Sequence, residues 1–534
     1  MQLSIRERCE KVAECIHIKG LQGLQAIANA TGLSISSVYR HQQAIARRNQ
    51  RPESWWWEVP VGSHCLKVLV LGVVYFFGIK HGIGAEGLSE FFDAVHLNHH
   101  VGTSASCLRK LKQQMRDAID AYEVAQQEHC HPHEGQGICV GGDETFFGLP
   151  ILVMVELASG YILTEVESEN RTYDSWSRQI QQWWTQPGWK CHFMVSDGAP
   201  ALIKLALSGL DCASVADLFH ALRALAAPIG SAIGRQISHL NKKVQTLQQQ
   251  YAKATKETKR QELQQSMEVI EAQQQILDEA KTIYHQALHG ITLTIHPFNL
   301  LTLEWQMFSA LSTRLSAPLQ QLSTLADRYG GNKASKAIDT FEQQIPSMAQ
   351  GIHAWWQWVT EVLVMKTDDL AVQQWVSTVL LPWTYWQQQA DKTRHPDLKQ
   401  QYQKAADRAY EQLAADALTQ HMGGQQGQQW MEWAQWMCAK YQRTSSAVEG
   451  RNGYLSRLHH AGRGLGEQHL RVLTTIHNFD LKKADGTTAA QRLFDHRFPN
   501  LFESIVDSID ELPLARRSSK AQPANPFPLG LFSA

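Results

Sequence analysis

The spacing of hydrophobic and polar residues near the N-terminus is typical of two short helices joined by a turn. Apolar positions recur at helical spacing up to Ala28, Gly32 supplies a turn, and Ser34 is placed to cap a second helix through Val38. A small residue, a glycine and an apolar residue at these positions allow two helices to pack closely. The pattern predicts a helix-turn-helix domain in residues 1–50, with an ordinary helical hairpin as the alternative.

The second of these helices is expected to present a polar and basic face. In a helix-turn-helix domain this face enters the major groove of duplex DNA. The residues that we expect to contact DNA from this helix are Ser36, Ser37, Arg40 and His41.

Residues 51–137 combine a linker with a second, less regular helical pattern. The second helix of that pattern carries Arg109, Lys110, Lys112 and Arg116, so it is either another DNA-binding element or a helical connector. The longest apolar run, Val68 to Ile79, has twelve residues. A run of that length is too short to span a bilayer as a helix, so we expect a buried element and no membrane partner.

From residue 138 the hydrophobic period changes to that of strands. Three apolar or alternating runs are followed by a helix, a fourth strand ending at Asp197, a helix, and a short fifth strand that leads into another helix. This order predicts an α/β fold for residues 138–230, with a mixed five-stranded sheet and flanking helices. The first strand should be central, with the fourth beside it.

The following segment, 231–440, has a different character. Over some fifty residues it contains neither Pro nor Gly, and its heptad-like pattern predicts a long antiparallel helical hairpin. Further Trp-rich helices follow, whose tryptophans we expect to fill a core. The sheet domain should then be completed by a helix in residues 441–485, and residues 486–534 should be an extension with a disordered tail.

Charge and cysteine content add little to this outline. The formal net charge is -1, so only local patches can favour nucleic acid. Residues 1–51 carry eight Lys and Arg against three acids, and residues 451–484 carry six against two. The nine cysteines include no C-x-x-C pair, and the N-terminus lacks the apolar core of a signal peptide. We therefore expect a cytoplasmic protein with reduced thiols.

Three acidic residues are the candidates for chemistry. Asp143 follows the start of the first strand, Asp197 closes the fourth, and Glu449 lies near the start of the late helix. Carboxylates that converge on one point repel each other unless cations join them, and hard oxygen ligands select Mg²⁺ or Mn²⁺. Two such ions about 3.5–4 Å apart can drive phosphodiester chemistry.

Other acids compete for these roles. Glu144 is the rival of Asp143, although strand alternation puts it on the opposite face of the sheet. Glu165 and Glu167 on the third strand are rivals of Glu449.

Four motifs together resemble a known family. They are GGDETFFG, VSDGAPAL, the Asp217-x-x-His220 of VADLFHAL, and SSAVEGRNGYLSR. They are similar to motifs of the DDE transposases of the RNase H-like superfamily, above all the hAT and Mutator-like groups and related bacterial insertion-sequence transposases. The resemblance covers roughly residues 138–485 and implies an RNase H-like fold interrupted by a large all-helical insertion. This chain places 54 positions between Asp143 and Asp197 and 252 between Asp197 and Glu449, and the insertion lies where the family pattern puts it, after Asp217-x-x-His220.

The resemblance implies a role for each matching residue. Asp143, Asp197 and Glu449 would be the metal ligands, and His220 with Asp217 would brace the site or touch the scissile phosphate. Asn452 would hydrogen-bond a phosphate or orient Glu449. The residues expected to hold backbone phosphates are Arg451, Arg457 and Arg463.

The implied function is DNA transposition in a bacterial, nucleoid-associated setting. The protein would bind the ends of its mobile element, hydrolyse a phosphodiester at each 3′ end and use the freed hydroxyl groups to attack target DNA. Two ends must be held together, so at least a dimer is expected. The alternatives are a catalytically inactive, transposase-derived helix-turn-helix protein and an RNase H-like metal nuclease.

Overall fold

The computed structural model describes residues 3–49, 51–132, 137–462 and 464–515. The chain forms two compact units. One comprises Met1–His131 together with Leu455–Ala534, and the other comprises Pro132–Tyr454. The boundary lies inside helix α18 (Ser446–His460), so the segment 441–485, expected to complete the sheet domain, is divided between the units.

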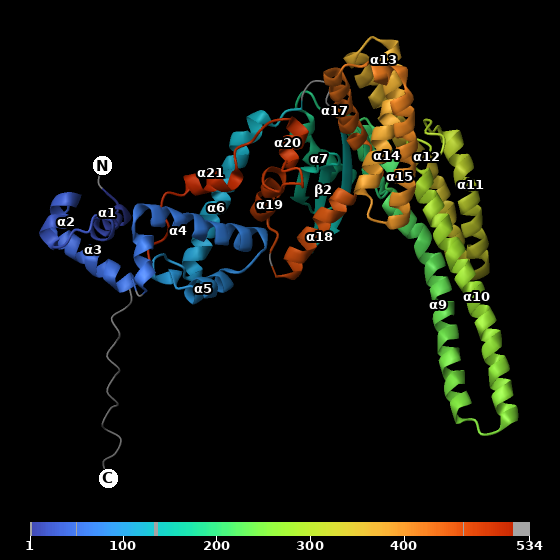
Figure 1. Ribbon diagram of the computed structural model, residues 1–534, viewed down its shortest axis with the longest axis horizontal. Coiled ribbons are helices and arrows are strands. Elements are labelled where there is room, and N and C mark those ends of the chain that lie inside the picture. The colour runs from blue at the N-terminus through green and yellow to red at the C-terminus, as the bar shows by residue number, and fades with distance from the viewer. Residues whose placement is uncertain (1–2, 50, 133–136, 463, 516–534) are drawn as a thin grey trace. The chain divides into compact units, whose positions relative to one another are not determined.

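The first unit begins with three helices, α1 (Ile5–His17), α2 (Leu24–Thr31) and α3 (Ile35–Arg48) (Figure 1). Gly32 ends α2 with a left-handed φ of 70°, and the Ser34 side chain caps α3 by accepting from the Ser37 amide. The predicted helices and turn are therefore present. Their role in DNA binding stays a prediction.

The hydrophobic residues of this three-helix group make one core, which includes Val12, Ile27, Val38 and Ile45. The prediction that Ser37 lies on the exposed face of α3 is wrong, because its side chain is only 8% exposed. Ser37 precedes Val38 and lies one turn before His41, on the side of α3 that faces α1. Ser36 and Arg40 are exposed, and His41 is partly buried.

The rest of the first unit is also helical. α6 packs against two helices from the C-terminal part of the chain, α19 and α21. The elements are η1 (Pro52–Glu58), α4 (Pro60–Val73), the π-helix η2 (Val74–Lys80), α5 (Ala85–Ala94), η3 (Leu97–His99), α6 (Ala105–Gln126), η4 (Gln127–His129), α19 (Glu467–Phe479), α20 (Ala489–Phe494) and α21 (Leu501–Ser508). The disordered tail expected at the end of the extension 486–534 lies outside the described residues from residue 516 onward.

The apolar run in this unit extends beyond the twelve residues noted in the sequence. α4 and η2 form a continuous apolar segment, Pro60–Lys80, whose length and composition alone would allow it to cross a membrane. Just over half of its most apolar window, 56%, is buried inside the structure. Leu66, Val70 and Tyr75 are among its fully buried side chains, a pattern that core helices also show.

The second unit contains one mixed five-stranded sheet. Its strands are β1 (Ile138–Phe146), β2 (Pro150–Glu156), β3 (Tyr161–Glu167), β4 (Cys191–Ser196) and β5 (Ala213–Ala216). Their order is β3-β2-β1-β4-β5, with antiparallel pairing along β3, β2 and β1 and parallel pairing along β1, β4 and β5. The expected central first strand and adjacent fourth strand are thus confirmed.

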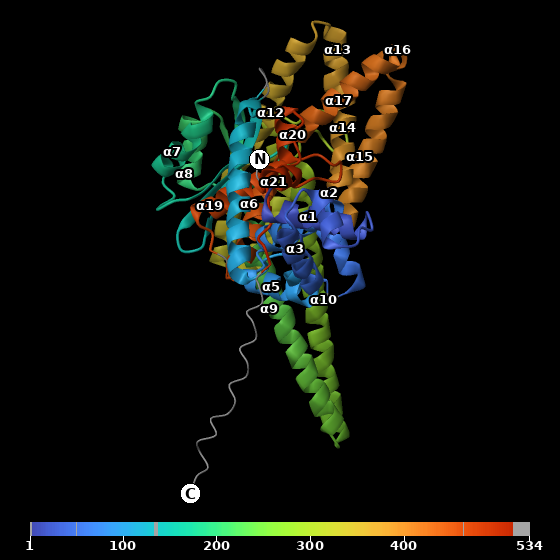
Figure 2. The same cartoon turned by 90° about the vertical axis from the view of Figure 1, so that its left-hand side faces the viewer.

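Helices surround this sheet and extend from it. α9 and α10 lie side by side as a long hairpin in both views (Figures 1 and 2). The helices are α7 (Tyr173–Trp184), α8 (Pro200–Lys204), η5 (Leu205–Gly209), α9 (Leu218–Lys253), α10 (Glu257–Thr294), α11 (Phe308–Leu325), η6 (Ala326–Gly330), α12 (Asn332–Lys366), α13 (Leu370–Trp375), η7 (Val376–Leu380), α14 (Leu381–Lys392), α15 (Pro396–Ala415), α16 (Ala417–His421) and α17 (Gly424–Lys440).

The hairpin begins earlier than expected. α9 starts at Leu218, directly after β5, so the predicted boundary at residue 231 falls inside a continuous helix. The tryptophans fill the core as predicted, since Trp355, Trp358 and Trp386 are completely buried. The sheet and the helical segment are therefore joined through one continuous helix.

Candidate functional site

The sheet brings two of the predicted acids to neighbouring positions. β1 and β4 run parallel, with Gly141 opposite Val195. Asp143 lies two residues beyond Gly141, and Asp197 lies two residues beyond Val195. Asp143, inside β1, and Asp197, directly after β4, therefore lie at neighbouring positions on the same face of the sheet.

Asp143 is held from two sides. Its Oδ1 atom accepts a hydrogen bond from the Glu144 amide at 2.8 Å, and its Oδ2 atom accepts one from Asn452 Nδ2 at 2.9 Å. Burial raises the pKa of the Asp143 carboxyl; the Glu144 amide and the His220 imidazole act to lower it, and the negative charges of Asp197 and Glu449 act to raise it. The three predicted acids are thus near enough to affect one another electrostatically.

Glu449 is positioned by α18 and contacts His220. The Oε1 atom of Glu449 lies 2.9 Å from Nε2 of His220, in the first turn of α9. The Nδ1 atom of His220 is buried and makes no hydrogen bond with the described residues. Since Asn452 lies one helical turn after Glu449, one face of α18 contacts both Asp143 and His220.

Asp217 connects the starts of two helices. Its Oδ1 atom accepts hydrogen bonds from the Phe219 and His220 amides, at 2.7 and 3.1 Å, and so caps α9. Its Oδ2 atom accepts hydrogen bonds from the amide and the hydroxyl of Ser445, directly before α18. Asp217 is buried, so of its two expected actions the structure favours bracing the site.

The prediction for Arg451 is wrong. Its guanidinium donates two hydrogen bonds to Glu165 of β3, at 2.7 and 2.6 Å, and the two side chains are 2% and 0% exposed. Arg451 is two positions from Glu449, so its side chain leaves α18 in a different direction and reaches the sheet instead of solvent. Glu165 is accordingly committed to Arg451, which disfavours it as the rival of Glu449.

The other rival acids also lie in different surroundings. Glu144 accepts a hydrogen bond from Trp176 Nε1 at 3.3 Å, and burial raises the pKa of its carboxyl. This places it on the face covered by α7, in agreement with strand alternation. Glu167 is exposed at the end of β3.

The remaining predicted DNA contacts belong to the first unit or to undescribed positions. Arg457 lies in the part of α18 that belongs to the first unit, and its side chain is exposed. Arg463 lies outside the described residues.

A further group beside the site was not foreseen. Arg443 Nη1 donates hydrogen bonds to the carbonyl groups of Thr292 and Ile295, at 3.0 and 2.8 Å, and lies 3.0 Å from His296 Nε2. The Arg443 carbonyl accepts from the Leu218 amide at 3.0 Å. The end of α10 and the start of α9 are therefore joined through the segment that precedes α18, a long-range contact that has no local sequence signal.

The donor chemistry of the acids suits a hard divalent cation, although they do not form a closed cluster. Within the described ranges, no group of three or more His, Cys, Asp or Glu side chains is arranged to hold a metal ion. The Glu449 carboxylate faces His220, and Asp143 faces Asn452. Asp143 nevertheless has a raised pKa because it is buried and lies near other carboxylates. A bound cation would offset this unfavourable environment by stabilising the ionised carboxyl group.

Comparison with known proteins adds one family. Residues 376–521 match a family of unknown function, DUF6399. The matched segment contains Glu449, Arg451 and Asn452 but not the sheet. No curated protein matches the chain.

Proposed function

We propose that the protein is a DNA transposase of the DDE type whose second unit is an RNase H-like catalytic domain. The observation that carries the proposal is the proximity of Asp143, Asp197 and Glu449, which come from two adjacent strands and one late helix. Three carboxyl groups collected from distant parts of a chain are costly unless they bind something positive.

Asp143, Asp197 and Glu449 would hold Mg²⁺ or Mn²⁺, expected as two ions. When bound, such ions activate a water or a 3′-hydroxyl group and stabilise the leaving oxygen of a phosphodiester. Oxygen-only donors fit these cations better than softer metals.

The neighbouring side chains have positioning roles in this proposal. Asn452 donates to Asp143 and fixes its carboxylate, leaving Oδ1 and Oδ2 with defined directions. His220 holds Glu449 by the contact of 2.9 Å, and its imidazole could carry a proton at Nε2. Asp217 keeps α9 and α18 in register, so that His220 and Glu449 meet.

The first unit would bind duplex DNA through α3 in this proposal. Ser36 and Arg40 are exposed on α3, as groove contacts require, and Arg457 is an exposed cation on α18. Strand transfer needs two DNA ends, so we propose at least a dimer in the bacterial cytoplasm, associated with the nucleoid.

A second candidate is a catalytically inactive descendant that still binds DNA. It is favoured by one observation, the pairing of Glu449 with His220 and of Asp143 with Asn452 in place of a closed carboxylate cluster among the described residues. An RNase H-like metal nuclease has the same site, and it differs in lacking strand transfer.

The test is cleavage of duplex DNA that carries the sequences flanking the gene, with the full chain and Mg²⁺ or Mn²⁺. The proposal expects nicks at a defined position and joining of the new 3′ ends to a second duplex. Asp143→Asn, Asp197→Asn and Glu449→Gln should each abolish both reactions, while Glu271→Gln, on an exposed face of α10, should abolish neither.

Each other result selects a different candidate. Cleavage without joining would identify the nuclease. Binding of the flanking DNA without cleavage by either metal would identify the inactive form. Full activity of one acid variant would remove that residue from the site.

A further inference from the structure

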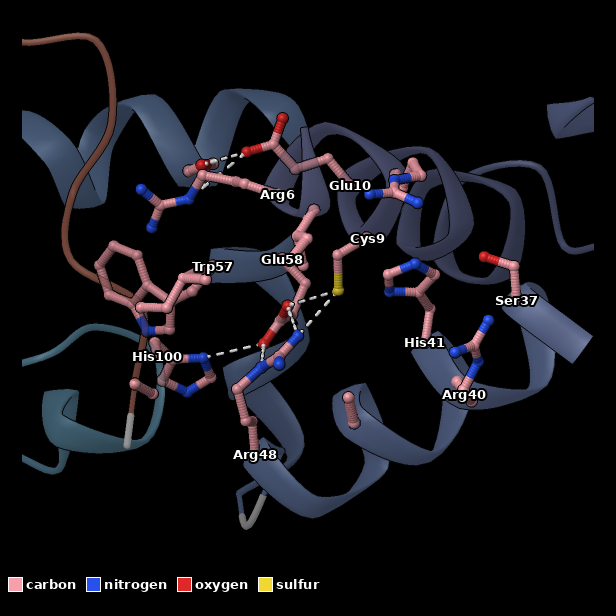
Figure 3. A pocket seen from close by; sticks show the side chains of 16 residues that line it. Arg6, Cys9, Glu10, Ser37, Arg40, His41, Arg48, Trp57, Glu58 and His100 are labelled. Carbon is pink, nitrogen blue, oxygen red and sulfur yellow. Dashed lines mark hydrogen bonds and ion pairs between the residues drawn. The ribbon is translucent and has the colours of Figure 1, made fainter. Parts of the chain in front are cut away.

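The first unit contains a recessed, partly open cavity that the proposed catalysis does not use. Its volume is about 410 Å³, and it lies between α1, α3, η1 and the segment at Leu514. Cavities of about 300–1,000 Å³ are the usual size of small-molecule sites. Figure 3 shows the side chains that line it.

The floor of the cavity is a closed polar cluster. Arg48 donates two hydrogen bonds to Glu58, both at 2.7 Å, and His100 Nδ1 lies 3.0 Å from Glu58 Oε1 (Figure 3). The Cys9 thiol lies 2.8 Å from Arg48 Nη2. The negative charge of Glu58 is therefore neutralised inside the cluster.

The walls carry an excess of positive charge. Four arginines and two glutamates line the cavity: Arg6, Arg8, Arg40, Arg48, Glu10 and Glu58. Glu10 accepts a hydrogen bond from the Ser63 hydroxyl, and its nearest contact with the Arg6 guanidinium is 3.9 Å.

Two of these arginines are available to an anion. Arg8 and Arg40 each use Nε on a carbonyl of their own helix region, at 3.2 Å, and among the described residues no carboxylate pairs with either. The electrostatic potential at His41 is positive. Burial and then the charges of Arg8, Arg48 and Arg40 lower the pKa of its imidazole. A positive field in a recessed site concentrates anions.

The opposite side of the cavity is aromatic. Trp57 lies beside His100, while Arg40 and His41 lie on the other side of the Cys9–Glu58–Arg48 cluster (Figure 3). The site thus combines arginine guanidinium groups, which are suited to bind phosphoryl oxygens, with the Trp57 ring, which can pack against an apolar part of a ligand.

We propose that this cavity binds a small organic phosphate of about the size of a nucleoside monophosphate, with its phosphoryl group at Arg8 and Arg40 and its body toward Trp57. The occupant would contact α3 through Arg40, a residue that we also expect to contact DNA. Ligand binding at this cavity does not involve the carboxylates of the second unit. It can therefore be tested whether or not the protein catalyses transposition.

The experiment is calorimetric titration of the full chain with 5′-AMP, adenosine and inorganic phosphate. AMP should bind saturably, adenosine should not bind, and inorganic phosphate should bind more weakly than AMP. Arg8→Gln and Arg40→Gln should each weaken AMP binding about ten-fold or more, since each removes a charge-assisted contact. Arg47→Gln, on an exposed face of α3 outside the cavity, should leave the affinity unchanged.

A second measurement uses the wild-type chain and so requires no variant to fold. In the wild-type chain, AMP but not adenosine should slow amide exchange in α1 and α3. Absence of saturable AMP binding, equal weakening by Arg47→Gln, or equal affinity for AMP and inorganic phosphate would overturn the proposal. The proposal would also be overturned if the wild type shows no AMP binding and the Arg8→Gln and Arg40→Gln variants lose duplex DNA binding. That result would assign these arginines to contacts with the DNA backbone.

Discussion

The Nε2 atom of His220 lies 2.9 Å from the Oε1 atom of Glu449, although 229 positions separate the two residues. The contact exists because Asp217 binds both the α9 amides and Ser445. A short motif after β5 and a helix near the end of the chain are thereby held as one structure. The insertion between them can be long without separating the two helices.

The first prediction concerns this link. Asp217→Ala removes the cap of α9 and leaves the buried Ser445 amide without its acceptor. We expect the free energy of unfolding of the second unit to fall by about 2–4 kcal/mol. Urea unfolding followed by far-UV circular dichroism measures the loss. Asp416→Ala is the matched control, because Asp416 caps the short helix α16 in the same way without a second partner helix. Equal losses in the two variants would contradict the linking role.

The second prediction concerns the buried pair of Arg451 and Glu165. Glu165→Gln leaves a buried guanidinium without its counter-charge, and we expect a loss of about 3–5 kcal/mol in the free energy of unfolding. The double variant Glu165→Leu with Arg451→Leu should recover a large part of that loss. Arg457→Gln, which changes an exposed arginine of the same helix, should change stability by less than about 0.5 kcal/mol. A Glu165→Gln protein as stable as Arg457→Gln would show that the pair is not formed.

The third prediction is an acid transition in the first unit. Burial opposes ionisation of Glu58, but the hydrogen bond from His100 and the guanidinium of Arg48 outweigh it and lower its pKa from 4.5 to about 2. A depressed carboxyl pKa contributes stability above pH 4.5, and that stability is lost as the pH falls from about 4.5 to about 2. The contribution at neutral pH is about 3 kcal/mol.

Its measurement compares Glu58→Gln with the wild type across that range. The variant should be less stable at pH 7, and the difference between the two proteins should shrink as the pH falls toward 2. The fluorescence of the tryptophans in η1, beside Glu58, follows this unit. A difference that stays constant from pH 7 to pH 2 would contradict the assignment.

The fourth prediction concerns the packing of α12 on the sheet. A Cβ atom at Gly351 would lie 2.8 Å from both methyl groups of Val215 in β5. Gly351→Ala should therefore destabilise the second unit by about 1–3 kcal/mol, despite the higher helix propensity of Ala. Gly427→Ala in α17, where the added atom would meet nothing within 4 Å, should be neutral or stabilising. Thermal unfolding of the two variants measures these changes in stability. A Gly351→Ala protein more stable than the wild type would show that Gly351 does not pack closely against Val215.

Much of the fold could be predicted because its signals are local. The strand pattern around Asp143 and Asp197 identified the central strand and its neighbour, and the Gly32 turn with the Ser34 cap identified the N-terminal helices. The errors concern side-chain direction. Ser37 and Arg451 are polar residues on helices, and only tertiary packing decides that one faces α1 and the other faces β3.

Other features could not have been predicted because they join distant segments. The link from Arg443 to the end of α10 and the pairing of Asn452 with Asp143 require the complete chain to be folded. The apolar run at Val68–Ile79 predicted a buried element but not the longer helical segment Pro60–Lys80 that contains it, since Pro60 can begin a helix as well as interrupt one.

Titration of Mn²⁺ into the full chain, with bound ions counted by electron paramagnetic resonance, tests whether Asp143, Asp197 and Glu449 share divalent cations. We expect about two tightly bound ions in the wild type. Asp143→Asn, Asp197→Asn and Glu449→Gln should each lose at least one of them, and Glu271→Gln should lose none. Identical Mn²⁺ binding in the wild type and all three acid variants would show that these carboxylates do not bind the ions.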